Sequence, residues 1–458
     1  MHYGNLQLVL KSLAKIQESA GKIIFIILFL DFFFRGITAQ TVPEDTLRNG
    51  TDKIRIDSIE IVGNETTENF IILRELTFKE GDLITQKELD YNRERVYSLG
   101  LFNKVNFYFF ENTLTIMVEE SWYIYPIPFF YWRENTLAKS TYGISLLYKN
   151  FRGRNETINA LAAFGYDPNY MLSYYNPVIS EKLNLSFSFG IYYSNFVNKS
   201  RQAELSYGKS FSYKSYGGFV GFGKRFNQFN DVFLLAGFSY VEAPALIKGF
   251  NAAKGRIDRS PSLTVQYLFD NRDLKQFSKE GLYTKVEYTH KGFYVNNIDY
   301  NILSIDFREY RNLLNTFTVR WRLASRFTFG KKIPIYDYSF LGIGEYIRGY
   351  LTKDREGHNM MLGSLELAYP ILDEWHLKLD LPLLPESLTS TRIGININLF
   401  VDTGTTFNNR EKLGYKNFDT GFGVGLTILF LPFNAVRFEY AFNESLIGEF
   451  IVGTGFAF

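Results

Sequence analysis

Apolar and polar residues alternate with a period of two over most of this chain, from about residue 122 to the end. In "LNLSFSFGI" (183–191) every second residue is Leu, Phe or Ile, and the residues between them are Asn, Ser or Gly. The same alternation recurs in "LTVQYLFD", "LYTKVEYTH", "FTVRWRLASRFTF", "IGININLFV" and "VRFEYAF". Successive side chains of a strand point to opposite faces of a sheet, so the pattern predicts many β-strands, each with one apolar face.

Two architectures produce this pattern: a soluble β-sandwich, and a β-barrel whose strands separate lipid from a hydrated lumen. Strand length, strand number and aromatic content favour the barrel. The apolar runs are roughly 9–12 residues long and number about 16, as expected for membrane-spanning strands. Aromatic residues make up 18% of the chain, and aromatic rings prefer the headgroup level of a bilayer. We therefore predict a transmembrane antiparallel β-barrel of about 16 strands over residues 122–458.

An apolar run near the N-terminus, Ile23–Phe34, indicates export. It spans about 12 residues and is interrupted by Asp31, whereas a transmembrane helix needs about 20. A lysine precedes the run and "ITA" follows it, as in a secretory signal with a small-residue cleavage site. We interpret residues 1–39 as a signal peptide that includes an extra N-terminal leader, and residues 40–51 as a linker. An uncleaved anchor is the alternative.

Residues 52–120 have a different pattern, which predicts one small α+β domain. "KIRIDSIEIVG" alternates as a strand does, and "TENFIILREL" and "TQKELDYNRERVYSLG" have helical spacing. The second helical segment opens with Thr85 and, three residues later, Glu88, which is the pattern of a capping box. "FNKVNFYFF" and "NTLTIMVEE" follow as two strands. The order β-α-α-β-β over about 70 residues is enough for one compact core.

The overall composition argues against several classes of function. The formal net charge is +2 and no basic stripe is visible, so we expect no nucleic-acid partner. The absence of cysteine excludes disulfides, cysteine-ligated zinc and thiol catalysis. The four histidines lack metal-binding spacing, and the chain has no nucleophile elbow or phosphate-binding loop. We expect a protein that is not an enzyme and has no cofactor and no metal.

The last predicted strand, "GEFIVGTGFAF", ends the chain on an aromatic residue. One face of this strand carries Phe450, Val452, Phe456 and Phe458, and the other carries Gly453 and Gly455. Such an ending resembles the C-terminal recognition signal of outer-membrane barrels; an ordinary edge strand is the alternative.

A barrel in lipid must also bring its first strand to its last, because an open sheet edge leaves backbone groups unpaired in hydrocarbon. We expect the first strand near Thr141–Tyr148 and the last over residues 448–458. The glycines of the last strand are expected to weaken the seam between the two.

Several short motifs resemble those of the BamA/TamA-like outer-membrane assembly and translocation superfamily, in which POTRA repeats precede a 16-stranded barrel. The motifs of the N-terminal domain are "IEIVGNETT", "FKEGD" and "LGLFNKVNF". Those of the barrel are "NFRGRNET" (150–157), "YYNP" (174–177), "EYIRGY" (345–350) and "FVDTG" (400–404). Asn155 stands where the family pattern has the last glycine of an early hairpin. The resemblance covers nearly the whole chain after the signal peptide and implies that residues 52–120 are one POTRA-like domain.

The resemblance further implies that a loop folds back into the barrel lumen and pairs with acidic groups on the inner wall. The loop motif consists of Ile347, Arg348, Gly349 and Tyr350, and the expected wall partners are Phe400, Asp402, Gly404 and Glu366. A solvated loop arginine and an aspartate in a strand-end turn are the alternative.

Strand parity supports the inward position of Asp402 independently of the resemblance. The alternate residues Ile393, Ile395, Ile397, Leu399 and Val401 are apolar and would face lipid, which turns Asp402 inward. Parity also places Glu366 of "GSLELAYPI" among the inward candidates. A carboxylate buried without a cation is costly, and the planar guanidinium of arginine binds a carboxylate with two hydrogen bonds.

The resemblance implies a protein-handling function in the bacterial outer membrane, with the POTRA-like domain in the periplasm. Unfolded outer-membrane proteins or a secreted polypeptide would be the clients, and the sheet edge of the domain could add a client strand. Periplasmic or lipoprotein accessory subunits and outer-membrane lipid are the other expected partners. A dedicated secretion pore and a passive channel are the alternatives.

The segment "PILDEWHLKLDLPLLPESLTS" (370–390) matches none of these motifs. We expect it on the periplasmic side, where barrel turns are normally short. Its leucine, proline and tryptophan content favours an interfacial segment or a partner contact, or else a turn packed over the mouth of the barrel.

Overall fold

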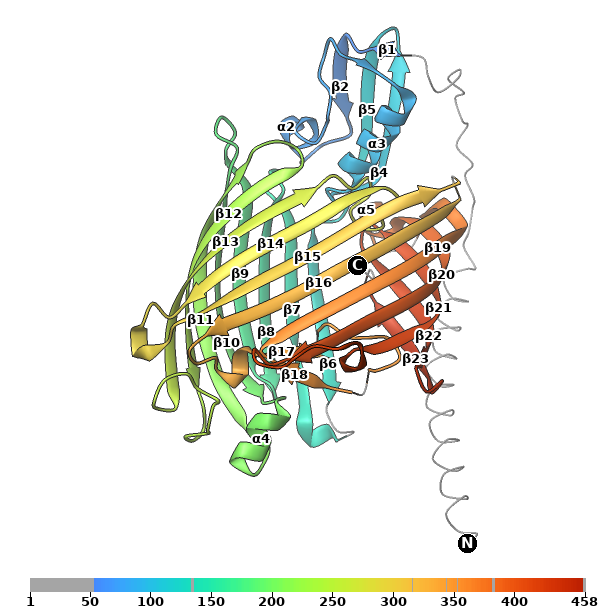
Figure 1. Ribbon diagram of the computed structural model, residues 1–458. Helices are drawn as coiled ribbons and strands as arrows, with labels where there is room; N and C mark the ends of the chain where they lie inside the picture. Colours follow the sequence, from blue (N-terminus) through green and yellow to red (C-terminus); the bar gives the residue numbers. More distant parts are fainter. Residues whose placement is uncertain are drawn as a thin grey trace.

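The computed structural model describes residues 53–132, 136–314, 316–342, 344–351, 353–380 and 384–455. The predicted signal peptide (1–39) and linker (40–51) lie outside these ranges, as do Phe456 and Phe458. The described chain forms a small N-terminal domain above one rim of a barrel made by a 16-stranded antiparallel sheet (Figure 1). This confirms the predicted fold class. Within the described ranges, no helix is long and apolar enough to cross a membrane.

The N-terminal domain packs two helices on a three-stranded sheet. Helices α2 (Asn69–Leu73) and α3 (Gln86–Tyr97) cover a sheet with the order β2-β5-β4. The strands are β2 (Ser58–Val62), β4 (Phe102–Phe110) and β5 (Thr113–Glu120), and two short strands, β1 (Ile54–Arg55) and β3 (Leu83–Ile84), pair with each other. The predicted capping box begins α3: the Glu88 amide donates to Thr85 Oγ1 (3.3 Å), and the Thr85 amide donates to Glu88 Oε2 (2.7 Å).

The barrel consists of long strands that follow one another around the sheet, with β17 and β18 set apart between β16 and β19. The strands are β6 (Ile124–Trp132), β7 (Ser140–Phe151), β8 (Glu156–Gly165), β9 (Asn169–Ser180), β10 (Leu185–Val197), β11 (Ser212–Arg225), β12 (Asn230–Glu242), β13 (Ile257–Asp270), β14 (Gly281–Lys291), β15 (Tyr300–Leu313), β16 (Phe317–Gly330), β19 (Asn359–Lys378), β20 (Ser390–Phe407), β21 (Asp419–Leu431), β22 (Asn434–Asn443) and β23 (Gly448–Thr454).

The alternation read from the sequence separates the two faces of the wall. In β20, Ile397, Leu399 and Val401 are exposed on the outside, whereas Phe400 and Asp402 between them are buried inside. Ile393, near the N-terminal domain, departs from this pattern and is buried.

The first barrel strand is β6, and the segment near Thr141–Tyr148 that we expected to be first lies in the second strand, β7. The sequence of β6, "IYPIPFFYW", hides its strand character, because it contains Pro126 and Pro128 and lacks the alternation of apolar and small residues. Among the described residues, β6 pairs with β7 and β23 pairs with β22, but no ladder joins β6 to β23. We call the line between β6 and β23 the seam.

The N-terminal domain is docked on the barrel through a buried ion cluster. Glu75 is 4% exposed and accepts hydrogen bonds from Arg95 of its own domain (3.0 Å) and from Arg225 of β11 (2.6 Å). Burial raises the pKa of Glu75, but the nearby cations Arg225, Lys275 and Arg95 lower it by more, and the pKa is about 2. An apolar cluster surrounds the contact, in which barrel residues join the core of the domain: Val178, Leu274, Phe277, Leu429, Leu431 and Ala435.

The segment 370–390 begins as strand rather than as a turn. Strand β19 continues through it to Lys378, helix α5 (Glu386–Thr389) follows, and β20 begins at Ser390. The register shifts between Pro370 and Leu372 and again between Leu372 and Trp375, which interrupts the period of two and hides the strand in the sequence. The tip of this hairpin contacts the N-terminal domain: the carbonyl of Ser387 accepts from Asn103 Nδ2 (2.7 Å) and from the Trp122 amide (3.1 Å).

At the opposite rim, loops from three hairpins pack together. The rings of Phe211 and Phe250 lie 5.2 Å apart, and those of Phe250 and Tyr336 lie 5.7 Å apart. Asp337 accepts from Lys291 Nζ (2.7 Å) and from the Tyr300 hydroxyl (2.6 Å). The short helices of this rim are α4 (Arg201–Tyr207), η2 (Val295–Asn297) and η3 (Ile335–Asp337); η1 (Leu137–Lys139) and η4 (Tyr415–Asn417) also lie between barrel strands.

We predict that Arg225→Ala weakens the docking of the domain by about 2–5 kcal/mol, because it removes one partner of a buried charge pair. Lowering the pH has the same effect, since Glu75 supplies its stabilisation only while ionised. That contribution is complete above the ordinary pKa of 4.5 and is lost as the pH falls through about 2. The measurement is the distribution of distances between spin labels on cysteines placed at the exposed residues Phe110 and Phe226, which broadens when the domain undocks.

Lys87→Ala is the matched control. Lys87 pairs with Glu280 across the same interface, but its side chain is 78% exposed, and an exposed pair contributes about 1 kcal/mol or less. Equal broadening in both variants would contradict the assigned role of Glu75.

Candidate functional site

The loop that carries the arginine motif lies inside the barrel. It connects β17 (Ser339–Leu341) to β18 (Arg355–Gly357), two short strands that pair with each other between β16 and β19. Ile347 is 3% exposed and packs in an apolar cluster with Leu341, Met360 and Leu362. The amides of Gly349 (2.8 Å) and Leu351 (3.1 Å) both donate to Glu449 Oε1 of β23. The loop therefore contacts the last strand of the sheet as well as the middle of the wall.

Arg348 is the central residue of this arrangement. Its side chain is 4% exposed and makes a two-pronged contact with Asp402, through Nε to Oδ2 (2.7 Å) and Nη2 to Oδ1 (2.8 Å). Its Nη1 atom also donates to Glu439 (2.9 Å) and to Glu366 (3.2 Å). The guanidinium lies over the ring of Phe400, 3.6 Å from the ring centre. One loop cation thus holds three acidic residues, from β19, β20 and β22.

Two further arginines complete the cluster from the wall. Arg320 Nη1 donates to Glu366 (3.3 Å), and Arg437 Nη1 donates to Glu439 (3.3 Å). Arg437 also donates to the hydroxyl of Tyr346 in the loop (3.1 Å). Three arginines therefore face three carboxylates, so the formal charge of the cluster is balanced although every member is buried. We call this set the lumen charge cluster: Arg320, Arg348, Arg437, Glu366, Asp402 and Glu439.

Glycines let the loop backbone approach the wall. Gly421 of β21 leaves room for the loop, since a Cβ atom there would lie 1.7 Å from the carbonyl oxygen of Arg348. Gly349 has a φ of +96°, and a Cβ atom on it would lie 2.7 Å from the Phe442 carbonyl oxygen. Gly404 leaves space for Ile347, whose Cδ1 atom would lie 3.2 Å from an added Cβ. The contact therefore needs glycine on both the loop and the wall.

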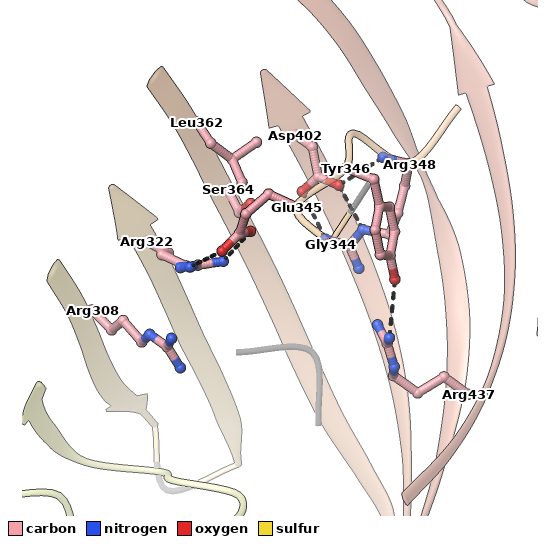
Figure 2. Close-up of a pocket in the computed structure, with 10 residues that line it drawn as sticks. All are labelled: Arg308, Arg322, Gly344, Glu345, Tyr346, Arg348, Leu362, Ser364, Asp402 and Arg437. Atoms are coloured by element: carbon pink, nitrogen blue, oxygen red, sulfur yellow. Dashed lines mark hydrogen bonds and ion pairs between the residues drawn. The ribbon is translucent and has the colours of Figure 1, made fainter. Parts of the chain in front are cut away.

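A polar cavity of about 290 Å³ opens beside the cluster (Figure 2). Figure 2 shows Arg348 against Asp402, Glu345 against Arg322, and Tyr346 against Arg437. The cavity is lined by Arg308, Arg322, Gly344, Glu345, Tyr346, Arg348, Leu362, Ser364, Asp402 and Arg437. Arg322 and Arg308 both donate to Asp306, so these wall cations are also paired. Among the described residues, no group of three or more histidines, aspartates or glutamates could hold a metal ion.

The structure places the motif residues expected in the lumen next to one another. Arg348 contacts Phe400, Asp402 and Glu366, and Gly404 lies against Ile347. Tyr350 packs beside the apolar cluster around Ile347 rather than against Arg348.

Sequence reasoning missed Glu439, Glu449, Arg320 and Arg437. Parity would have found Arg437 and Glu439, because in "VRFEYAF" they alternate with apolar residues that face outward.

The residues of the predicted C-terminal signal lie along the seam. Phe450 and Val452 are 50% and 53% exposed on the outer face of β23. Gly453 lies on the inner face, where an added Cβ would be 3.0 Å from Arg437 Nη2, and Gly455 has a φ of +92°. Phe456 and Phe458 lie outside the described residues.

The fold defines a class of protein: a β-barrel preceded by a POTRA-like domain, with an arginine loop in its lumen. A family model for the Omp85 superfamily domain matches residues 150–458, and a POTRA model, described as surface antigen variable number repeat, matches residues 54–121. The chain belongs to the Omp85 superfamily, whose barrels are outer-membrane proteins with periplasmic POTRA domains. This confirms the resemblance read from the sequence motifs.

One of the matching solved structures, a BamA barrel, supports this fold. BamA from Haemophilus ducreyi lacking POTRA domains 1–3 matches with a TM-score of 0.52 and 17% identity, over 88% of this chain and 84% of that chain. CdiB from Acinetobacter baumannii gives a TM-score of 0.45 and 15% identity, over 88% of this chain and 73% of that chain. CdiB from Escherichia coli gives 0.46 and 10%, over 96% of each chain. Comparison with the curated proteins gives no match.

We predict that Arg348→Ala destabilises the folded barrel by about 3–5 kcal/mol, because it leaves buried carboxylates without their shared cation. Arg348→Lys should recover only part of this loss, since an ammonium cannot reproduce the two-pronged contact with Asp402. The measurement is urea unfolding of the purified protein in detergent, followed by the loss of the compact band on unheated gels.

The control is Arg311→Ala, which removes an arginine of the same barrel whose side chain is 70% exposed and pairs with Glu309. An unfolding midpoint of Arg348→Ala equal to that of this control would refute the importance of the cluster.

We also predict that Gly421→Ala releases the loop from the wall. The overlap with the Arg348 carbonyl costs roughly 1–3 kcal/mol, which corresponds to roughly 5- to 150-fold in the population of the undocked loop. Hydrogen–deuterium exchange of residues 344–351 should accelerate by that factor. Gly363→Ala of β19 is the control, because the nearest atom to its added Cβ is 3.5 Å away. Unchanged exchange in Gly421→Ala would contradict the proposed contact.

Proposed function

We propose that this protein assists the insertion and assembly of other outer-membrane proteins. Its POTRA domain receives an unfolded client in the periplasm, and the client passes into the membrane at the seam between β6 and β23. Periplasmic or lipoprotein accessory subunits assist delivery, and outer-membrane lipid surrounds the outer face. We propose no catalytic step.

The observation that carries this proposal is the interruption of the sheet at the seam. Consecutive barrel strands from β6 to β23 are joined by hydrogen-bonded ladders, whereas no ladder joins β6 to β23 among the described residues. Backbone groups without partners are costly in hydrocarbon, so such a line favours the entry of an extended segment that supplies them.

The lumen charge cluster supports the proposal by holding the wall next to the seam. The loop contacts β20 through Asp402, β22 through Glu439 and β23 through Glu449. The last strands are therefore braced from inside, independently of any pairing with β6. A barrel held in this way can open at the seam while its other strands keep their pairing.

A passive channel has less support. The N-terminal domain is docked over one rim (Figure 1), and the loops around Phe250 and Tyr336 pack together at the opposite one. Arg348 and its partners occupy the lumen between the two. A dedicated secretion pore shares the fold and the domain order, and the experiment below distinguishes it from general assembly.

The test is depletion of the protein in its native host, followed by quantitative mass spectrometry of the outer membrane. Loss of many unrelated barrel proteins is the expected result. Loss of one secreted protein alone would favour the secretion pore, and an unchanged proteome with altered solute permeability would favour the channel.

Complementation of the depleted host with variants at matched expression tests the role of the lumen charge cluster separately from the amount of protein. A gene encoding Arg311→Ala should restore the outer-membrane proteome, whereas Arg348→Ala should not restore it at matched expression. Full rescue by Arg348→Ala would remove the cluster from the mechanism and leave the proposed function to be judged by depletion alone.

A further inference from the structure

Building on the proposed function, we propose that the two edges of the seam are not equivalent: an incoming client strand pairs with β23, because Pro126 and Pro128 remove hydrogen-bond donors from the free edge of β6. The occupant of this edge is an extended polypeptide strand, recognised through its backbone.

The direction of the backbone groups in β6 follows from its ladder with β7. The two strands pair in antiparallel register, with Ile124 opposite Tyr148 and Pro128 opposite Ile144. The Lys149 amide donates to the Tyr123 carbonyl (2.8 Å), so Tyr123 and Lys149 form a hydrogen-bonded pair. Such pairs alternate with non-hydrogen-bonded ones along an antiparallel ladder. The odd-numbered residues of β6 therefore bond to β7, and the even-numbered residues direct their backbone groups towards the seam.

Both prolines occupy seam-facing positions in the middle of β6. Proline has no backbone N–H, so residues 126 and 128 present a carbonyl and a ring where other residues present a donor. The neighbouring seam-facing amides belong to Ile124 and Phe130, six residues apart. At about 3.3 Å per residue, this leaves roughly 20 Å of the edge without a donor. The pairing of β6 with β7 is unaffected, because those amides point away from β7.

The free edge of β23 contains no proline and therefore lacks no backbone donor. The Gly455 amide donates to the Ala435 carbonyl (2.8 Å), and the Asn443 amide donates to the Ile447 carbonyl (3.1 Å). These two bonds lie at the two ends of the β22–β23 ladder and show that the odd-numbered residues of β23 bond to β22. The residues that face the seam are Gly448, Phe450, Val452 and Thr454. None is proline, so each has both a donor and an acceptor.

A client strand is therefore received differently by the two edges. On β23, each seam-facing residue can exchange two hydrogen bonds with the residue opposite it. On β6, the client carbonyls opposite residues 126 and 128 would find no donor, and the proline rings would occupy the space they need. In a hydrocarbon environment water cannot replace the missing donors. The same two prolines account for the absence of a β6–β23 ladder among the described residues.

The chain contains no cysteine, so a single introduced cysteine is its only thiol. A disulfide to the client then shows that the client lies at that edge of the seam. The test compares Ile124→Cys on β6 with Val452→Cys on β23, two residues whose backbone groups face the seam and whose parent side chains are 40% and 53% exposed. The probe is the precursor of a barrel protein from the same host, with one cysteine in its last strand and a folded domain fused to its N-terminus to arrest insertion. We expect the disulfide yield at residue 452 to exceed that at residue 124 by on the order of tenfold, a difference of about 1.4 kcal/mol.

Restoring the donors provides the second arm. In the Ile124→Cys background, Pro126→Val together with Pro128→Val should raise the yield at residue 124 several-fold. Migration of the compact band on unheated gels verifies that each variant is folded.

A higher yield at residue 124 than at residue 452 in the parent background would overturn this inference and leave the proposed function standing. An unchanged yield after the double proline substitution would overturn the role of the prolines. Absence of crosslinks at both edges, with folded protein and arrested precursor, would overturn the proposed function as well.

Discussion

The structure depends on one constraint: within a bilayer, every backbone N–H and C=O group needs a partner from the protein itself. The sheet meets this constraint by joining each barrel strand to the next from β6 to β23. It also explains why the seam matters, because the described residues there show no ladder. The two prolines of β6 remove donors that would otherwise require partners. The edge of β6 thus differs chemically from the edge of β23, which contains no proline.

The same requirement applies to the charges inside the wall. Asp402, Glu366 and Glu439 lie on three strands, and each is at most 2% exposed. The loop supplies their shared cation, Arg348. While the loop is bound, the three carboxylates of the wall can therefore stay buried in their charged form. Since the loop also contacts β23 through Glu449, the electrostatics of the lumen and the position of the last strand are linked.

The sequence predicted features that depend on local periodicity. The barrel, the capping box at Thr85 and the inward position of Asp402 follow from side-chain alternation or helix capping, which a single strand or helix encodes. The structure departs from the sequence-based prediction where that regularity is broken. Prolines hid β6, and register shifts near Pro370 hid the continuation of β19. The partners of Arg348 on β22 depend on which strands meet across the lumen, and no local pattern contains that information.

The hairpin of β19 and β20 has a consequence beyond its length. It carries Glu366 and Asp402 in the lumen, and at its tip the Ser387 carbonyl bonds to the N-terminal domain. Cross-strand pairs connect these two regions of the hairpin, with register shifts between Pro370 and Trp375. A client that shifts the N-terminal domain would also displace the tip of the β19–β20 hairpin. The same hairpin holds the Arg348 loop, so this displacement would reach the lumen through the protein itself.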